Sequence, residues 1–177
     1  MQPVKGTLVD DGEYATLIFR RVYHHRIQHV WDAIATPEGL QEWLLCTFAV
    51  IDGRAGGRIE LVSGPAGYHS TGRILVWDPP RVFEYEWNIA PVPEMPRGEH
   101  AIFRYELTPE ADSTHLLVMY RRITKQTASG FLPGLHAFLD RLEAQLDGRM
   151  PPDFTQRFTE LRAVYPEWSG HASDPAE

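Results

Sequence analysis

Aromatic residues at alternating positions are the part of the sequence best suited to recognise a small molecule. In segment 83–89, aromatic and polar side chains alternate, which places the aromatic rings on one face of a strand. Segments 101–107 and 114–122 repeat this pattern. The face that we expect these strands to share comprises Phe83, Tyr85, Trp87, Phe103, Tyr105 and Tyr120. It either lines a partly open cavity, where polar tips orient a ligand, or forms a filled core with each hydroxyl bonded to backbone, and the sequence leaves both interpretations open.

Charged residues on two neighbouring strands are a second candidate site. Arg58 and Glu60 alternate with Ile59 and Leu61. The pattern favours the register in which the apolar pair faces the core and both charges face solvent. In the opposite register the charges would form a buried ion pair that His69 on the next strand could join, and such a cluster is a candidate for acid–base chemistry.

Two further sets of reactive side chains lack the surroundings that their chemistry needs. His24, His25 and His29 lie close together, but no carboxylate or cysteine completes a ligand set, so we predict no metal ion and no cofactor. Cys46 is the only cysteine, and no positive charge lies nearby in sequence to stabilise its thiolate. We therefore expect it to be a small buried hydrophobic residue.

Motifs of known catalytic chemistry are missing from the sequence. Gly56-Gly57 lacks the further glycine and the following helix of a phosphate-binding loop, and no Gly-x-Ser-x-Gly nucleophile motif occurs. By alternation, Glu84 and Glu86 point away from the aromatic face. We predict no catalytic residues, and the sequence favours a protein that is not an enzyme.

Length and composition indicate one soluble domain. The chain has 177 residues, 43% of them hydrophobic, which is enough for a single packed core. A formal net charge of −7 argues against nucleic acid and anionic membranes as partners. The single cysteine fits a reducing compartment, and no segment reaches the ~18 apolar residues of a membrane span, so we expect a cytoplasmic location.

Two helices are expected to interrupt a series of strands. The apolar residues of 27–34 recur at steps of three and four, and Thr36-Pro37 ends that helix and begins a second one, which runs to about Leu44. Trp31 and Trp43 are predicted to anchor this pair to the sheet. Strands are expected over 14–24, 47–51, 58–63, 68–77, 83–89, 101–107 and 114–122.

A long helix is expected after the last strand. An apolar stripe from Leu132 to Leu146 predicts a helix from about Leu132 to Asp147, and Gly148 suits its end. Pro133 is expected in the first turn, because deeper inside a helix it would cost about 3 kcal/mol. The side opposite the stripe carries His136, Arg141, Glu143 and Gln145.

A terminal helix is predicted from the capping pattern Asp153-x-x-Gln156. Its apolar stripe packs either on the domain or across a homodimer, and consists of Phe154, Phe158, Leu161 and Tyr165. The order of elements predicts an α+β fold: a curved antiparallel sheet wrapped around a long C-terminal helix, with a helix pair after the first strand and an extra terminal helix. We expect a flexible leader over 1–12, a domain over 13–148, and a helical extension and tail over 149–177.

Several short motifs, taken in order, resemble one known group of proteins. They are Val30-Trp31-Asp32-Ala33, Thr36-Pro37-Glu38, Trp43, Gly56-Gly57, Gly72 through Arg81, and Gly134-Leu135-x-x-x-Leu139-x-x-Leu142. The series resembles the START-like (SRPBCC, birch-pollen-allergen-like) superfamily, whose fold is called the helix grip. Within it, the series is similar to the activator of heat-shock-protein-90 ATPase homologue family. The chain departs from that pattern at Arg26, where a proline is usual, and at Leu135, where a tryptophan is usual.

The resemblance implies an internal apolar cavity between the sheet and the long helix. The helix would add Leu135, Phe138, Leu139 and Leu142 to the aromatic face as cavity residues. The leading hypothesis is a binding protein for a small hydrophobic or amphipathic ligand, with Tyr85, Tyr105 and Tyr120 orienting its polar end. The alternatives are a chaperone ATPase-activator-like interaction protein, which rests on the resemblance alone, and a cyclase or hydrolase that uses the cavity. No nucleic acid and no membrane is expected as a partner.

Overall fold

The computed structural model describes residues 4–165 and contains, within that range, eight strands and four helices. The strands are β1 (Thr7–Asp10), β2 (Tyr14–Tyr23), β3 (Phe48–Ile51), β4 (Arg58–Ser63), β5 (Tyr68–Asp78), β6 (Val82–Ile89), β7 (Glu99–Glu110) and β8 (Ser113–Thr124). The helices are α1 (Ile27–Ala35), α2 (Pro37–Trp43), α3 (Lys125–Leu146) and α4 (Phe154–Arg162). All strands pair antiparallel in one sheet, in the order β1-β2-β8-β7-β6-β5-β4-β3.

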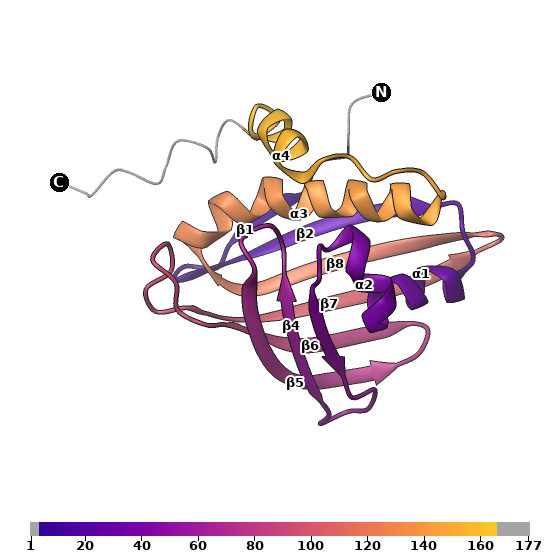
Figure 1. Cartoon of the computed structure of the whole chain (residues 1–177), viewed down its shortest axis with the longest axis horizontal. Helices are drawn as coiled ribbons and strands as arrows, with labels where there is room; N and C mark the ends of the chain where they lie inside the picture. Colours follow the sequence, from indigo (N-terminus) through magenta and orange to yellow (C-terminus); the bar gives the residue numbers. More distant parts are fainter. Residues whose placement is uncertain (1–3, 166–177) are drawn as a thin grey trace.

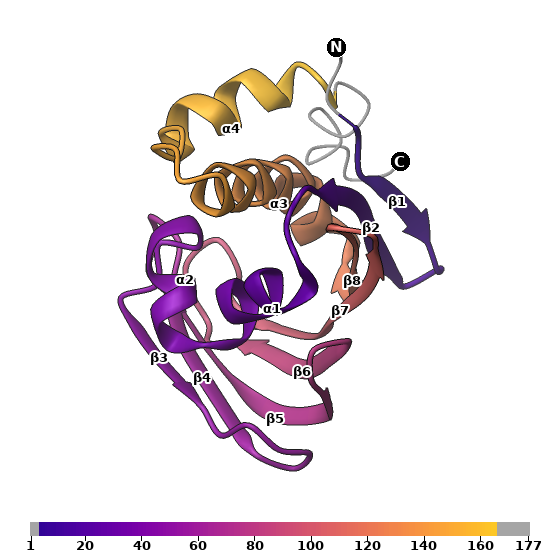
Figure 2. The same ribbon diagram turned by 90° about the vertical axis from the view of Figure 1, so that its right-hand side faces the viewer.

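The sheet curves around α3, which crosses its concave side (Figure 1). Helix α4 lies on the side of α3 that faces away from the sheet, while α1 and α2 occupy part of the concave side next to α3 (Figure 2). The predicted fold class is therefore confirmed, including the helix pair after the first long strand and the extra terminal helix. Among residues 4–165, no helix is both long and apolar enough to cross a membrane.

Alternation along the central strands builds the core between the sheet and α3. On β7, Ala101, Phe103, Tyr105 and Leu107 are buried while the residues between them are at least partly exposed. The register sets Phe103 opposite Tyr85 on β6 and opposite Tyr120 on β8. Because side chains directly opposite each other share a face of the sheet, the predicted aromatic face is one continuous surface.

The helix pair is held by the residues that the sequence indicated. Thr36 ends α1 and caps α2, since its Oγ1 accepts a hydrogen bond from the N–H of Gly39 at 3.0 Å. Trp43 is fully buried, and its Nε1 donates to the carbonyl oxygen of Ala33 at 2.8 Å. Trp31 is buried too. Trp31 contacts Trp77 and Phe83 of the sheet, as predicted, whereas the hydrogen bond of Trp43 joins the two helices of the pair.

Helix α3 begins earlier than expected, at Lys125, so the prediction that Pro133 lies in the first turn is wrong. The apolar stripe extends toward the N-terminus through Ala128 and Leu132, both fully buried, and Phe131 stacks on Tyr120. Burying a large apolar side chain stabilises by about 1.5–3 kcal/mol, which is comparable to the cost of a proline inside a helix. Packing of this first part of α3 therefore offsets the proline.

The N-terminal segment differs from the expected flexible leader. Strand β1 pairs with β2, from Thr7 opposite Ile18 to Asp10 opposite Ala15. The turn between the strands is closed locally, because the N–H of Gly12 donates to the side chain of Asp10 at 2.8 Å. The first three residues of the predicted leader lie outside the described range.

Helix α4 packs back onto α3. The N–H of Gln156 donates to the Asp153 carboxylate at 2.9 Å, which confirms the predicted N-terminal cap. Phe154 lies against Phe138 with ring centroids 4.4 Å apart, and Arg157 pairs with Asp140 of α3 at 2.8 Å. Of the two predicted arrangements, the structure shows the one in which α4 packs on the domain of its own chain. The tail after residue 165 lies outside the described residues.

Candidate functional site

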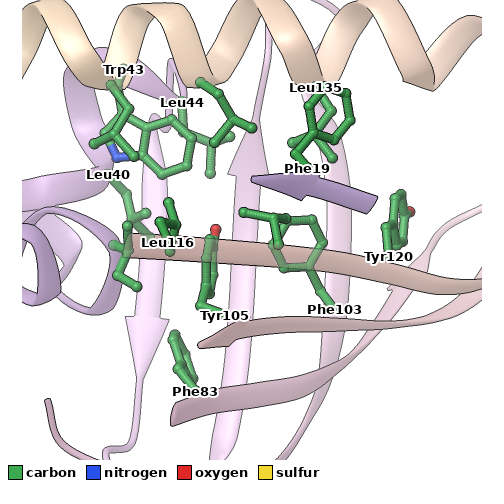
Figure 3. Close-up of a cluster of buried hydrophobic side chains, with 14 of the residues drawn as sticks. Phe19, Leu40, Trp43, Leu44, Phe83, Phe103, Tyr105, Leu116, Tyr120 and Leu135 are labelled. Carbon is green, nitrogen blue, oxygen red and sulfur yellow. The ribbon is translucent and has the colours of Figure 1, made fainter. Parts of the chain in front are cut away.

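A cavity of about 320 Å³ lies between the sheet and the N-terminal half of α3. The sequence-predicted residues that line it are Tyr85, Trp87, Phe103, Tyr105, Tyr120, Leu135 and Phe138. Figure 3 shows Tyr105, Phe103 and Tyr120 on the strands beneath α3, with Leu135 reaching down from the helix. No Lys, Arg, His, Asp or Glu of the described chain lines this cavity.

Three predicted cavity residues lie elsewhere in the core. Phe83 packs against Trp31 and Trp77, with ring centroids 6.0 and 5.1 Å away. Leu139 and Leu142 are fully buried and do not line the cavity. The helix pair fills this end of the space between sheet and α3, so the open volume is confined to the other end. The filled-core and cavity interpretations therefore each hold for one end of the aromatic face.

Several cavity walls were not predicted from the sequence. They come from the turn between β4 and β5, from the first part of α3 and from α4, and they are Gly64, Pro65, Ala66, Tyr68, Phe131, Phe154 and Phe158, among others. The rings of Tyr68 and Phe131 are neighbours in the cavity wall, with centroids 6.2 Å apart. The apolar stripe of α4 was a usable signal for the phenylalanines. Phe131 was missed because the predicted helix began one residue after it.

The aromatic rings form a stack that leads from the sheet to α3. The indole of Trp87 lies over the ring of Tyr120, with centroids 5.0 Å apart and planes 23° apart. Tyr120 in turn stacks on Phe131, at 6.0 Å and 19°. Ala101 stands opposite Trp87 on β7, and its small side chain leaves room for rings from β6 and β8 to meet above it. One wall of the cavity is therefore flat and aromatic.

The polar tips of these rings fall into two groups. The hydroxyls of Tyr85 and Tyr105 interact with each other. The hydroxyl of Tyr120 and Nε1 of Trp87 are buried, and neither has a hydrogen-bond partner among residues 4–165. The sequence could not distinguish the groups, because all four side chains alternate in the same way.

Burial controls the protonation of the cavity tyrosines. It raises the pKa of Tyr85 and of Tyr120 well above the ordinary value near 10, and it raises the pKa of Tyr105 as well. The negative charge of Glu99 adds to the effect at Tyr120. All three phenols stay neutral at physiological pH and can donate hydrogen bonds, but they cannot act there as general bases.

Glu99 is a buried carboxylate that sequence analysis missed. It is 2% exposed, its Oε1 accepts from the N–H of Thr124 at 2.6 Å, and its Oε2 accepts from the hydroxyl of the same threonine at 3.1 Å. Thr124 precedes α3, so the carboxylate caps that helix and sits where its dipole favours negative charge. The inward-facing positions Phe103 and Ala101 are two residues apart. Continuing this alternation by two more residues would have placed Glu99 on the inner face.

The charged cluster on β4 and β5 lies outside the cavity. Ile59 and Leu61 are buried, so Arg58 and Glu60 point to the convex face, as the favoured register predicted. His69 Nε2 lies 2.8 Å from Glu60 Oε1, and both Arg58 and His69 are largely exposed. This cluster therefore has no access to a ligand held between sheet and helix.

The remaining candidate residues have structural partners. His25 Nε2 lies 2.7 Å from Asp147, and His24 Nδ1 lies 3.1 Å from the hydroxyl of Ser113. Across the part of the chain that the structure describes, no group of three or more His, Cys, Asp or Glu could hold a metal ion. Cys46 is 5% exposed, and burial raises the pKa of its thiol, which confirms a buried, unactivated cysteine.

The curved sheet, the long helix against its concave face and the cavity between them define a helix-grip protein of the START-like superfamily. The sequence profile described as "Activator of Hsp90 ATPase homolog 1-like protein" matches residues 24–147, and the chain belongs to that family. No curated protein matches the chain.

Solved structures of several bacterial proteins share the fold. The crystal structure of CalU16 from Micromonospora echinospora has a TM-score of 0.69 at 22% identity, over 94% of this chain and 95% of that one. Protein MLL2253 from Mesorhizobium loti has a TM-score of 0.66 at 24% identity, over 75% and 97% of the two chains. The protein encoded by gene BPP1335 of Bordetella parapertussis has a TM-score of 0.66 at 19% identity, over 100% and 98%. At these identities the similarity establishes the fold alone.

Proposed function

We propose that this protein binds a small, uncharged, largely apolar molecule in the cavity between the sheet and α3. The observation that carries the proposal is the cavity itself, which is lined mainly by aromatic and aliphatic side chains, with no charged group among the described residues. Pockets that bind small molecules have this character: mostly apolar walls and a few polar groups that fix orientation.

The size of the cavity limits the ligand. Its volume of about 320 Å³ is near the lower end of the ~300–1,000 Å³ range of small-molecule pockets. A compact molecule of a few rings suits this volume better than a long-chain lipid. Burial of the ligand's apolar surface would drive binding, at about 25 cal/mol per Å².

The arrangement favours binding over catalysis. The phenols of the cavity are neutral donors, and the one histidine–carboxylate pair considered for acid–base chemistry, His69 with Glu60, lies on the opposite face of the sheet. A cyclase or hydrolase would need a titratable group next to the ligand. The proposed protein therefore holds and shields its ligand without changing it.

Leu135 offers a direct test, because it lines the cavity and stands where the family pattern has tryptophan. N-phenyl-1-naphthylamine, an uncharged dye that becomes fluorescent in apolar sites, is titrated into the unmodified protein, Leu135→Trp and Leu135→Met. The tryptophan should fill part of the cavity and weaken dye binding at least about tenfold, whereas methionine, close to leucine in volume, should leave binding nearly unchanged.

A thermal unfolding curve for each variant shows that the fold is kept. Saturable binding that is equally tight in Leu135→Trp would place the dye outside the cavity. The absence of saturable binding to the unmodified protein would count directly against the proposed function.

A further inference from the structure

We infer that the ligand is a flat, neutral aromatic compound with a hydrogen-bond acceptor, such as a ketone oxygen, that is recognised by Trp87 and Tyr120. The inference rests on the proposed function and specifies the chemistry of its ligand. It is carried by two buried donor groups of the cavity wall that have no protein partner within the described range, and by the ring stack to which they belong.

The two donors are unusual within the cavity. An indole N–H can only donate a hydrogen bond, and a buried donor left without an acceptor costs about 1–3 kcal/mol. Tyr85 and Tyr105, which line the same cavity, interact with each other. Buried polar groups in native proteins nearly always have partners, so the lack of a partner at Trp87 Nε1 and at the Tyr120 hydroxyl requires an explanation.

Both side chains belong to the wall of the cavity, so we assign the missing acceptor to a ligand. Tyr120 is 1% exposed, and it lines the cavity together with Trp87. Their rings are stacked 5.0 Å apart, which brings side chains from β6 and β8 to the same wall. An acceptor on a ligand in the cavity would be offered two donors from neighbouring, rigidly packed rings.

The charges nearby favour a neutral acceptor. No positively charged side chain of the described chain lines the cavity, so a carboxylate or phosphate would be buried without a counter-ion. The carboxylate of Glu99 lies close enough to Tyr120 to raise the pKa of its phenol. The same negative charge would repel an anionic group placed beside the phenol. A carbonyl oxygen avoids both costs.

The shape of the wall favours a flat ring system. Trp87, Tyr120 and Phe131 stack at interplanar angles of 23° and 19°, and Tyr85 stacks on Phe103 at 19°. Offset stacking of an aromatic ligand on such a wall contributes about 0.5–1.5 kcal/mol beyond the area it buries. A flexible aliphatic chain would not make these contacts.

The experiment compares two probes that differ in one group. In 2-acetylnaphthalene a ketone oxygen is available, and in 2-isopropenylnaphthalene a methylene group replaces that oxygen at nearly the same shape. Each is used to displace N-phenyl-1-naphthylamine from the unmodified protein, Tyr120→Phe and Trp87→Phe. We expect the ketone to bind about tenfold more tightly than the hydrocarbon to the unmodified protein, and the preference to disappear in Tyr120→Phe and to fall in Trp87→Phe.

Tyr23→Phe is the matched control. Tyr23 is also a buried tyrosine, but it lies outside the cavity and its hydroxyl donates to the carbonyl oxygen of Leu139 at 3.1 Å. This variant should keep the preference for the ketone. In the absence of any probe, Tyr23→Phe should lower the melting temperature, whereas Tyr120→Phe should not, because its hydroxyl has no bond within the protein to lose.

The outcomes separate this inference from the proposed function. If the dye binds but the two naphthalenes compete equally, or if neither competes, the recognition of a neutral aromatic acceptor is wrong while cavity binding stands. A melting temperature that drops in Tyr120→Phe as much as in Tyr23→Phe would also overturn the inference, since the hydroxyl would then have a structural role. If the dye itself fails to bind, the proposed function fails and this inference fails with it.

Discussion

The hydroxyl oxygen of Tyr165 lies 2.6 Å from Nδ1 of His136, and the same oxygen accepts a hydrogen bond from the N–H of Gly6 at 2.7 Å. Because Gly6 already donates to this oxygen, the phenolic proton can be given to Nδ1, which suits a neutral imidazole that carries its hydrogen on Nε2. One side chain after α4 thus connects the middle of α3 to the segment before β1. The strength of the hydrogen bond between Tyr165 and His136 depends on the charge of the histidine.

The free energy of unfolding should therefore fall on mild acidification. His136 is fully buried, and this burial, followed by the positive charges of Arg21 and Arg157, lowers its pKa from 6.5 to about 3. Asp140 lies 3.6 Å from Nε2 but already pairs with Arg157 at 2.8 Å. Since the unfolded chain binds a proton below pH 6.5 and the folded chain does not, stability is complete above that pH and is lost as the pH drops toward 3. Between pH 7.5 and 5 the loss from this group should reach about 2 kcal/mol.

Urea unfolding at pH 7.5 and pH 5.0 measures this effect. The variant His136→Gln should lose most of the difference between the two pH values, whatever its absolute stability. His100→Gln, which changes an exposed histidine on β7, is the control and should leave the difference unchanged. A pH dependence that is the same in the His136 variant as in the unmodified protein would contradict the assignment.

The fold could be predicted from local sequence patterns, because no tertiary contact overrides them. Thr36-Pro37 predicts the end of one helix and the start of the next because proline excludes the helical conformation from the residue before it. The period-two pattern of segment 83–89 predicts a strand with one buried face, and Phe83, Tyr85 and Ile89 of β6 are buried as predicted, although Glu84 on the other face is buried too. Such signals act within a few residues, so the sequence alone carries them.

The burial of His136 and Arg141 could not be predicted in the same way. Both lie opposite the apolar stripe of α3, on the side that the sequence marks as polar, yet they are 0% and 6% exposed. They are covered by segments outside α3: His136 contacts Phe19 of β2 and Tyr165 after α4, and Arg141 contacts the end of α2 and the segment before α4. The position of the cavity also depends on contacts between distant segments. Phe83 packs against Trp31 of the helix pair, whereas Tyr120 lines the cavity.

Replacing Arg141 by methionine should destabilise the protein strongly. Its guanidinium donates to three backbone carbonyl oxygens: those of Trp43 at 3.1 Å, of Glu42 at 2.6 Å and of Pro152. It thereby ties the end of α2 and the segment before α4 to α3. The variant Arg141→Met keeps the apolar stem but removes all three of these hydrogen bonds, so we expect a loss of at least about 2 kcal/mol in urea unfolding.

The same substitution at Arg149 is the control. This arginine is 60% exposed and pairs with Asp147 at 2.9 Å, an arrangement that typically contributes less than about 1 kcal/mol. Equal losses at the two positions would show that the buried network of Arg141 does not hold the helices together.

Two glycines in helices should respond to alanine in opposite directions. Gly130 lies inside α3, and a Cβ added there would meet no heavy atom within 4 Å. Alanine restricts the unfolded chain and favours the helix, so Gly130→Ala should stabilise by about 1 kcal/mol and raise the melting temperature by about 2–4 °C.

Gly39 lies inside α2, where a Cβ would overlap the carbonyl oxygen of Asp32 in α1. Gly39→Ala should therefore lower the melting temperature, because the two helices would have to separate, although its gain in helix propensity is the same. Thermal unfolding of both variants measures the contrast, and a rise at both positions would mean that the close approach of α1 and α2 is not needed for stability.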